Sequence, residues 1–229
     1  RAVLVQPLFP GEDNSYVADC AREDPHRFAA VCVVDPRRED AAGQLSYWVS
    51  ERGCTGLRLR PKVPEEEACF GAPSTFELWE QVVHLNVNVS LLCGADHLPR
   101  VDEIATQFPR ATIVIDHLAH PDLSRGVQTP EFEQLLHLAR HPRVYAKTSG
   151  FGYYSSQAFP YQDCYPAVQL LLDRFGPERL VWGSDFPHIL LECGYRRAMT
   201  VMDHALPGVS SKVRDQIMGE NARALYWRD

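Results

Sequence analysis

The chain has 229 residues, of which 45% are hydrophobic and 23% are charged. These proportions are those of an ordinary globular protein whose core is large enough to be stable unaided, so they exclude a disordered chain. The 30 acidic and 23 basic residues give a formal net charge of -7, which disfavours nucleic-acid and anionic membrane partners.

Strand-like runs rich in β-branched residues recur along the chain, and stretches with a helical spacing of apolar positions separate them. The predicted strands are Ala2 to Gln6, Phe28 to Val34, Thr55 to Leu59, Val87 to Cys93, Thr112 to Asp116, Val144 to Thr148 and Leu180 to Ser184. The predicted helices are Ser15 to Arg22, Asp40 to Arg52, Ser74 to Leu85, Leu98 to Phe108, Pro130 to Arg140, Tyr165 to Phe175, Arg196 to His204 and Ser210 to Tyr226. This alternation indicates parallel strands joined by crossover helices.

Two architectures fit that alternation, a closed barrel and an open doubly wound sheet. An open sheet usually has a Gly-rich phosphate turn after its first strand, and Gln6-Pro-Leu-Phe-Pro-Gly11 is not one. We therefore predict a (β/α)8 TIM-barrel type of α/β fold that forms a single domain over residues 1–229. Because only seven strands are predicted and closure needs eight, we expect the first β/α unit to be missing from the chain.

The seven cysteines are odd in number, widely scattered and without a C-x-x-C pair, as expected of buried thiols in a reducing compartment. The longest clean apolar run, Phe28 to Val34, is far too short to span a bilayer, and the amino end does not resemble a signal peptide. We therefore expect a cytoplasmic protein. Its oligomeric state stays open, and a homo-oligomer is one of the alternatives.

Functional side chains of a parallel barrel cluster at the carboxyl ends of its strands. In the stretch from Val181 to His188, an apolar run ends on Asp185, just where a loop should begin. His117 follows the predicted strand that ends at Asp116. A lone histidine is more often a cap or a backbone partner, but the strand-end position and the companion acid favour a catalytic pair. His188 lies in the loop beyond, where a turn role and a substrate-binding role are both open.

Cationic and aromatic side chains near these strand ends are candidates for substrate binding. Arg58 and Arg60 alternate with leucines, so both guanidinium groups should point into the barrel. Arg58 in particular could hold a substrate carboxylate, and the alternative for either arginine is an ion pair with a structural acid. Lys147 is a further candidate, and it precedes a loop that contains Tyr153 and Tyr154. These two tyrosines could contact the substrate or pack within the loop.

Five motifs follow one another along the chain. They are Gly56-Leu-Arg-Leu-Arg-Pro61, Ile115-Asp-His-Leu-Ala-His-Pro121, Lys147-Thr-Ser-Gly150, Trp182-Gly-Ser-Asp-Phe-Pro187 and Glu220-Asn-Ala-Arg-Ala-Leu-Tyr226. Together they resemble the amidohydrolase-related family of metal-dependent hydrolases, over essentially the whole chain. The resemblance implies a (β/α)8 barrel and a hydrolase acting on a small carboxylated or sugar-derived lactone, which would be its small-molecule partner.

By resemblance, His117 is the histidine of the family's sixth strand, and Asp185 is the acid of its eighth strand, which accepts a proton from the attacking water. The family's first strand supplies a metal-binding His-x-His pair, which would lie upstream of Arg1. The resemblance thus implies either no metal or one divalent ion, zinc or manganese, held by His117 and Asp185 only if that pair exists. The segment Val87 to Cys93 has no histidine, which favours the lactonase branch, some of whose members work without a metal.

Two other functions stay open. The first is a metal-dependent decarboxylase or amide hydrolase of the same family, whose ligands include an upstream His-x-His. The second is a truncated noncatalytic barrel that binds a small ligand or a protein, because an open barrel exposes strand edges that invite pairing.

Overall fold

The computed structural model describes residues 1–7, 11–61, 63–123 and 125–227. Leu8 to Pro10, within the motif from Gln6 to Gly11, therefore lie outside the described residues. The chain forms two compact units. The first consists of Arg1–Cys93, Pro99–Val114 and Arg223–Asp229, and the second consists of Gly94–Leu98 and Ile115–Ala222.

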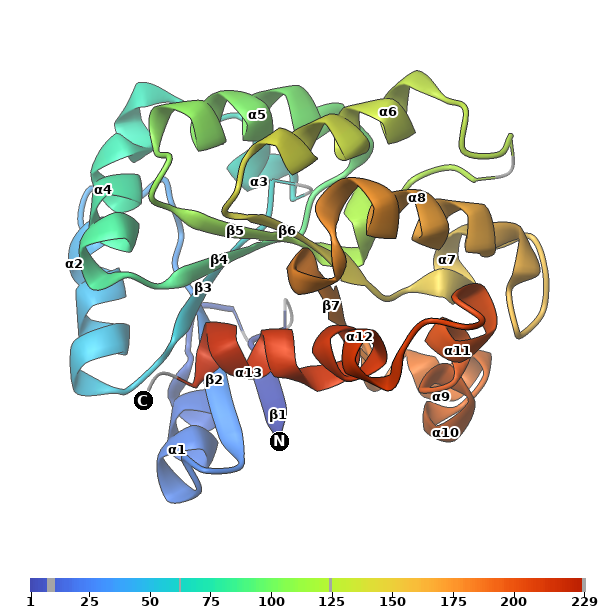
Figure 1. Ribbon diagram of the computed structural model, residues 1–229. Helices are drawn as coiled ribbons and strands as arrows, with labels where there is room; N and C mark the ends of the chain where they lie inside the picture. Colours follow the sequence, from blue (N-terminus) through green and yellow to red (C-terminus); the bar gives the residue numbers. More distant parts are fainter. Residues whose placement is uncertain (8–10, 62, 124, 228–229) are drawn as a thin grey trace. The chain divides into compact units, whose positions relative to one another are not determined.

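Strands and helices alternate along the described residues, as the sequence predicts (Figure 1). The strands are β1 (Ala2–Val5), β2 (Phe28–Val33), β3 (Gly56–Leu59), β4 (Asn88–Leu91), β5 (Thr112–Ile115), β6 (Val144–Thr148) and β7 (Leu180–Trp182). The longer helices are α1 (Ser15–Glu23), α2 (Ala41–Ser46), α4 (Phe76–Leu85), α5 (Leu98–Gln107), α6 (Pro130–His137), α8 (Tyr165–Phe175), α11 (Val201–Ala205), α12 (Ser211–Asp215) and α13 (Asn221–Tyr226). Each strand begins within one residue of its predicted start.

Short helical segments make up much of the rest. The four-residue helices are α3 (Pro64–Glu67), α7 (Phe151–Tyr154), α9 (Ile189–Glu192) and α10 (Tyr195–Ala198). The 3-10 segments are η2 (Pro73–Thr75), η3 (Ala95–His97), η4 (Asp116–Ala119), η5 (Leu138–Arg140), η6 (Gln162–Cys164) and η7 (Pro177–Arg179), and the π segments are η1 (Tyr47–Glu51) and η8 (Gln216–Glu220). The predicted helix Arg196 to His204 is divided between α10 and α11, and α7 replaces the predicted loop after Gly150. Four residues are too few to display a 3.6-residue period, so such helices leave no periodic signal in a sequence.

In the first unit, β1, β2, β3 and β4 pair in parallel in chain order, with Val31 opposite Gly56 and Gly56 opposite Asn88. Every residue of β2 from Ala29 to Val33 is buried, as expected of a parallel strand covered on both faces. Helix α1 packs against β2, and α2 packs against α4. The continuous apolar composition of β2 thus places it in the core of this unit.

Two polar residues of β4 are buried in the same unit and have hydrogen-bond partners near the end of the chain. The Asn88 side chain donates to the carbonyl of Leu225, and the Ser90 hydroxyl lies 3.1 Å from the hydroxyl of Tyr226. These bonds satisfy groups whose burial would otherwise be costly, and they attach the last turn of α13 to β4.

In the second unit, β6 and β7 pair in parallel, with Lys147 opposite Val181. Helix α8 packs against both strands. Helix α6 begins as predicted, because Pro130 occupies its first turn and the Thr129 hydroxyl accepts a hydrogen bond from the backbone N–H of Phe132 at 3.2 Å. The carboxyl ends of β6 and β7 therefore lie next to each other in this unit, and the segments that follow them carry the candidate site.

Four of the seven thiols are buried, at Cys32, Cys54, Cys93 and Cys164, and the other three are half-buried. The predicted burial therefore holds for the majority. Among the helices of the described part, none has the length and apolar character that a membrane span requires.

Candidate active site

The chain leaves β5 through a segment with an unusual backbone. His117, Leu118, Ala119 and His120 all have left-handed conformations, with φ values of 50°, 55°, 61° and 50°. Such conformations cost about 1–3 kcal/mol per residue and persist only where the surroundings impose them. The first three of these side chains are buried, so packing holds the segment in place. The strained backbone fixes the position of the His117 ring.

The His117 imidazole has a polar neighbour at each of its ring nitrogens. Its Nδ1 lies 2.9 Å from the Ser149 hydroxyl, and its Nε2 lies 3.7 Å from Oδ1 of Asp185. Burial lowers the pKa of His117 to about 4, although the charges of Asp116 and Asp185 oppose this shift. The ring is therefore neutral near pH 7, with Nε2 directed toward the carboxylate that the sequence pairs with it.

Asp185 lies three residues beyond the end of β7 and also has a left-handed backbone, with φ of 52°. Its Oδ2 accepts a hydrogen bond from the Tyr153 hydroxyl. Partial burial, followed by this bond and the Asp185 charge, raises the pKa of Tyr153, so the phenol keeps its proton. One carboxylate oxygen is thus occupied by Tyr153, and the other faces His117.

The Tyr153 ring lies among three imidazoles. It stacks on His120 with ring centroids 6.1 Å apart, and it meets His117 and His188 edge to face, each at 6.2 Å. The Tyr153 side chain is 47% exposed, so this aromatic group can be reached from solvent. The structure therefore brings together four of the predicted site residues: His117, Asp185, Tyr153 and His188.

Lys147 and Tyr154 lie close by but are engaged in other contacts. The Lys147 ammonium group donates to the carboxylate of Asp116, which is 1% exposed. Tyr154 is buried, and its hydroxyl donates to the main-chain carbonyl of Ser149. These contacts suit residues that support the neighbours of His117, and a direct role of either residue in substrate binding stays a prediction.

Three further residues shape the site without having been among the predicted site residues. Ser149 contacts Nδ1 of His117, as described above. It directly follows β6 and lies two residues after Lys147, so the alternation of side chains along a strand could have identified it. Gly150 has φ of 75°, and a Cβ added there would lie 3.1 Å from Nδ1 of His117. Glu192 lies against the backbone of Gly152, and nothing in the sequence near it indicates that contact.

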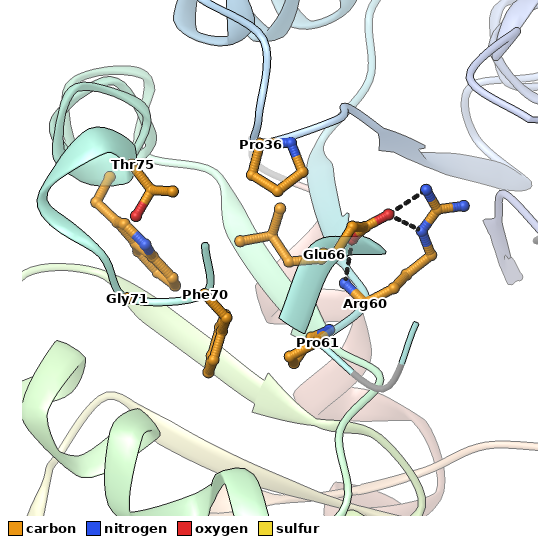
Figure 2. A pocket seen from close by; sticks show the side chains of 9 residues that line it. Pro36, Arg60, Pro61, Glu66, Phe70, Gly71 and Thr75 are labelled. Atoms are coloured by element: carbon orange, nitrogen blue, oxygen red, sulfur yellow. Dashed lines mark hydrogen bonds and ion pairs between the residues drawn. The ribbon is translucent and has the colours of Figure 1, made fainter. Parts of the chain in front are cut away.

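The predicted arginines both belong to the first unit. Arg58 is half-buried, and its Nη1 donates to the carbonyl of Gln6 at 3.4 Å. Arg60 is buried and forms an ion pair with Glu66, whose Oε2 also accepts the backbone N–H of Arg60 at 2.9 Å (Figure 2). Burial raises the pKa of Glu66, even though the Arg60 charge acts in the opposite direction. For Arg60 the structure thus shows the alternative of an ion pair with a structural acid.

The same ion pair lines a small cavity of about 10 Å³ in the first unit. Figure 2 shows its lining, which includes Pro36 beside the ion pair and Phe70 and Thr75 across from it. Since Arg60 and Glu66 bond to each other, their charges are already compensated. None of the residues that line this cavity belongs to the cluster around His117.

A divalent metal would have two donor atoms at the candidate site. His117 Nε2 and Asp185 Oδ1 lie 3.7 Å apart, close to the separation of about 3.3 Å that two ligands adopt on a tetrahedral zinc ion. The contact between Ser149 and Nδ1 also suits ligation through Nε2, because a ligating histidine usually bonds through its other nitrogen. A catalytic zinc usually has three protein ligands, so this pair fits a metal as a partial ligand set.

Comparisons with known proteins agree with one another. Residues 1–228 match the amidohydrolase family. The chain is 30% identical over 190 residues to an L-fucono-1,5-lactonase of Burkholderia ambifaria, a match that covers 82% of this chain and 64% of that protein, and so less than two thirds of it. A solved structure of a putative 2-pyrone-4,6-dicarboxylic acid hydrolase from Pseudomonas putida has a TM-score of 0.82 at 28% identity, covering 97% of this chain and 80% of its own. A zinc-bound amidohydrolase from Burkholderia multivorans shares the fold, with a TM-score of 0.85 at 22% identity over 98% of this chain and 82% of its own.

Proposed function

We propose that this chain, which belongs to the amidohydrolase family, hydrolyses the ester bond of a small carboxylated or sugar-derived lactone. The lactonase and the pyrone hydrolase among the similar proteins support this reaction class. The observation that carries the proposal is the 3.7 Å gap between His117 Nε2 and Asp185 Oδ1. This gap is too long for a direct hydrogen bond, and a single water molecule can contact both atoms across it.

In the proposed reaction, Asp185 accepts a proton from that water through Oδ1, because Oδ2 is occupied by the Tyr153 hydroxyl. The water oxygen then attacks the carbonyl carbon of the lactone. A general base positioned in this way contributes about 10²- to 10⁴-fold to the rate. Asp185 later returns the proton to the ring oxygen as the carbon–oxygen bond breaks, which yields the open hydroxy acid.

Negative charge develops on the carbonyl oxygen during the attack, and donors must be directed at it. When Ser149 donates to Nδ1 of His117, the neutral ring carries its proton on Nε2, from which it can donate to this oxygen. The Tyr153 hydroxyl keeps its bond to Oδ2 of Asp185 and holds this carboxylate in position. Arg58 lies in the first unit, and its role as a cationic substrate contact stays a prediction.

The proposed architecture is a (β/α)8 barrel, which places reactive groups beyond the carboxyl ends of its strands. His117 follows β5 and Asp185 follows β7 in that way. If a zinc or manganese ion is bound, His117 and Asp185 would hold it together with at least one further ligand, and the ion would polarise the lactone carbonyl.

Replacement of Asp185 by Asn tests the proposal. The amide cannot accept the proton, so we expect kcat to fall by about 10²- to 10⁴-fold for whichever member of a lactone panel the wild type hydrolyses. The fold should be retained, as judged by circular dichroism and the melting temperature. Asp173→Asn, at an exposed position on α8, is the matched control and should leave kcat unchanged.

Near-normal turnover by Asp185→Asn would reject Asp185 as the base. The absence of turnover by the wild type across sugar and aromatic lactones would reject the reaction class. Elemental analysis, with activity measured before and after chelation, separates the two metal alternatives. Activity that survives complete metal removal favours the metal-free mechanism, and activity restored only by zinc or manganese favours the metal-assisted one.

A further inference from the structure

The Glu192 carboxylate is fixed beside the candidate site by a contact that only glycine permits. Glu192 ends α9, and its carboxylate accepts a hydrogen bond from the backbone N–H of Gly152 in α7. A Cβ at position 152 would overlap this carboxylate. Gly152 precedes Tyr153, so the segment that presents the phenol to Asp185 also holds Glu192.

Glu192 interacts electrostatically with the catalytic pair. Partial burial, and after it the Asp185 charge, raise the pKa of Glu192, while His188 has the opposite effect. The Glu192 charge in turn contributes to the raised pKa of Tyr153. Glu192 contacts Gly152, and the next residue, Tyr153, bonds to Asp185, so one short segment connects the two carboxylates.

The positive charge nearest to these two acids is already compensated. Lys147 donates to the buried carboxylate of Asp116, which is 1% exposed. Among the described residues of the second unit, neither Asp185 nor Glu192 has an ion pair with a lysine or an arginine. The carboxylates of Asp185 and Glu192 therefore make this part of the site acidic.

We propose that Glu192 is a specificity-determining residue that makes the site prefer uncharged, hydroxylated lactones over lactones that carry a carboxylate. The inference rests on the proposed lactone hydrolysis and adds a substrate class to it. A substrate anion placed against Asp185 and Glu192 would experience like-charge repulsion, whereas the hydroxyl groups of a neutral sugar lactone would donate hydrogen bonds to the same carboxylate oxygens. Discrimination of this kind works by rejecting the wrong ligand.

The predicted role of Arg58 leads to the opposite expectation, because an arginine that binds a substrate carboxylate would favour anionic lactones. The two residues can be compared with a matched pair of substrates. One is D-glucono-1,5-lactone, and the other is the lactone with the same ring in which C6 is a carboxylate. Steady-state hydrolysis is measured with a pH indicator after subtraction of the spontaneous rate.

We expect the wild type to have a kcat/KM at least about tenfold higher for the neutral lactone, the size expected for one partly screened charge contact. Glu192→Gln, which keeps an oxygen for the Gly152 N–H, should raise kcat/KM for the anionic lactone about tenfold and lower that for the neutral lactone, whose hydroxyl groups lose a charged acceptor. Sodium chloride at about 0.5 M should produce a similar gain in the wild type and a smaller one in the variant. Glu133→Gln, at an exposed position on α6, is the matched control and should leave the ratio unchanged.

Equal or faster hydrolysis of the anionic lactone by the wild type would overturn the proposal and assign the dominant charge to a cation such as Arg58. An unchanged ratio in folded Glu192→Gln would overturn it as well, and the salt dependence of the wild type decides the matter if that variant does not fold. If the wild type hydrolyses neither lactone nor any other member of the panel, the proposed function itself fails. That result differs from a loss of discrimination between two active substrates.

Discussion

At the scale of single residues, the function of a charged side chain depends on the partner that it finds. Arg58 lies in β3 and Arg60 directly follows it with the same parity, yet Arg60 is 9% exposed and bonds to Glu66. Glu66 lies six positions after Arg60, in the four-residue helix α3, which has no periodic signal in the sequence. No spacing rule predicts a contact between a strand end and such a helix. The sequence could therefore offer an ion pair for Arg60 only as an alternative.

Because the pair is buried, removal of one partner should cost more than removal of both. Glu66→Gln leaves the Arg60 charge without its counterion, and we expect the free energy of unfolding to fall by about 3–5 kcal/mol. The double variant Arg60→Met, Glu66→Leu removes both charges and should lose clearly less. Urea denaturation of the three proteins measures these differences. A double variant as unstable as Glu66→Gln would contradict the argument.

At the scale of elements, the strands could be predicted because a short run of β-branched residues is typical of a buried strand. The segments that connect strand ends to the site could not be predicted as well. The left-handed turn from His117 to His120 contains no glycine to signal it, and α7 is too short to show a period. These two segments place His117 and Tyr153 opposite Asp185. The strand ends were therefore located to within two residues, and the conformation beyond them was not predicted.

The start of α7 offers a test of how closely its backbone and the site are coupled. Gly150 has φ of 75°, and a Cβ there would lie 2.9 Å from Cδ2 of Tyr153 and 3.1 Å from Nδ1 of His117. We expect Gly150→Ala to lose about 1–2 kcal/mol of stability through its left-handed backbone and also to lower kcat, because one of these rings must shift.

Gly53→Ala is the matched control for this prediction. Gly53 has a similar φ of 76°, but a Cβ at that position meets no atom within 4 Å. The control should show a comparable loss of stability in thermal or urea denaturation, with unchanged kcat in the lactone assay. Equal kcat values for the two variants would show that the site tolerates a side chain at position 150.

At the scale of the whole molecule, burial of the cysteines gives a measurable pattern. Cys20, Cys69 and Cys193 are half-buried, and the other four thiols are buried. With Ellman's reagent, we expect up to three thiols to react readily in the native protein and all seven to react in guanidinium chloride. Fewer than seven under denaturing conditions would indicate a disulfide, against the expectation from the scattered, odd-numbered cysteines.

The sequence by itself determined the order and type of the strands and the family, and it nominated His117 and Asp185 for the candidate site, because apolar runs and strand-end motifs are local features of the chain. Only the tertiary structure decided the partners: Tyr153 with Asp185 and Ser149 with His117, each 32 residues apart in the chain, and Glu192 with Gly152. Contacts over such separations depend on the pairing of strands and on the backbone turns beyond them. Local residue patterns do not encode either of these, so the charge and hydrogen bonds around the candidate base follow from the folded chain.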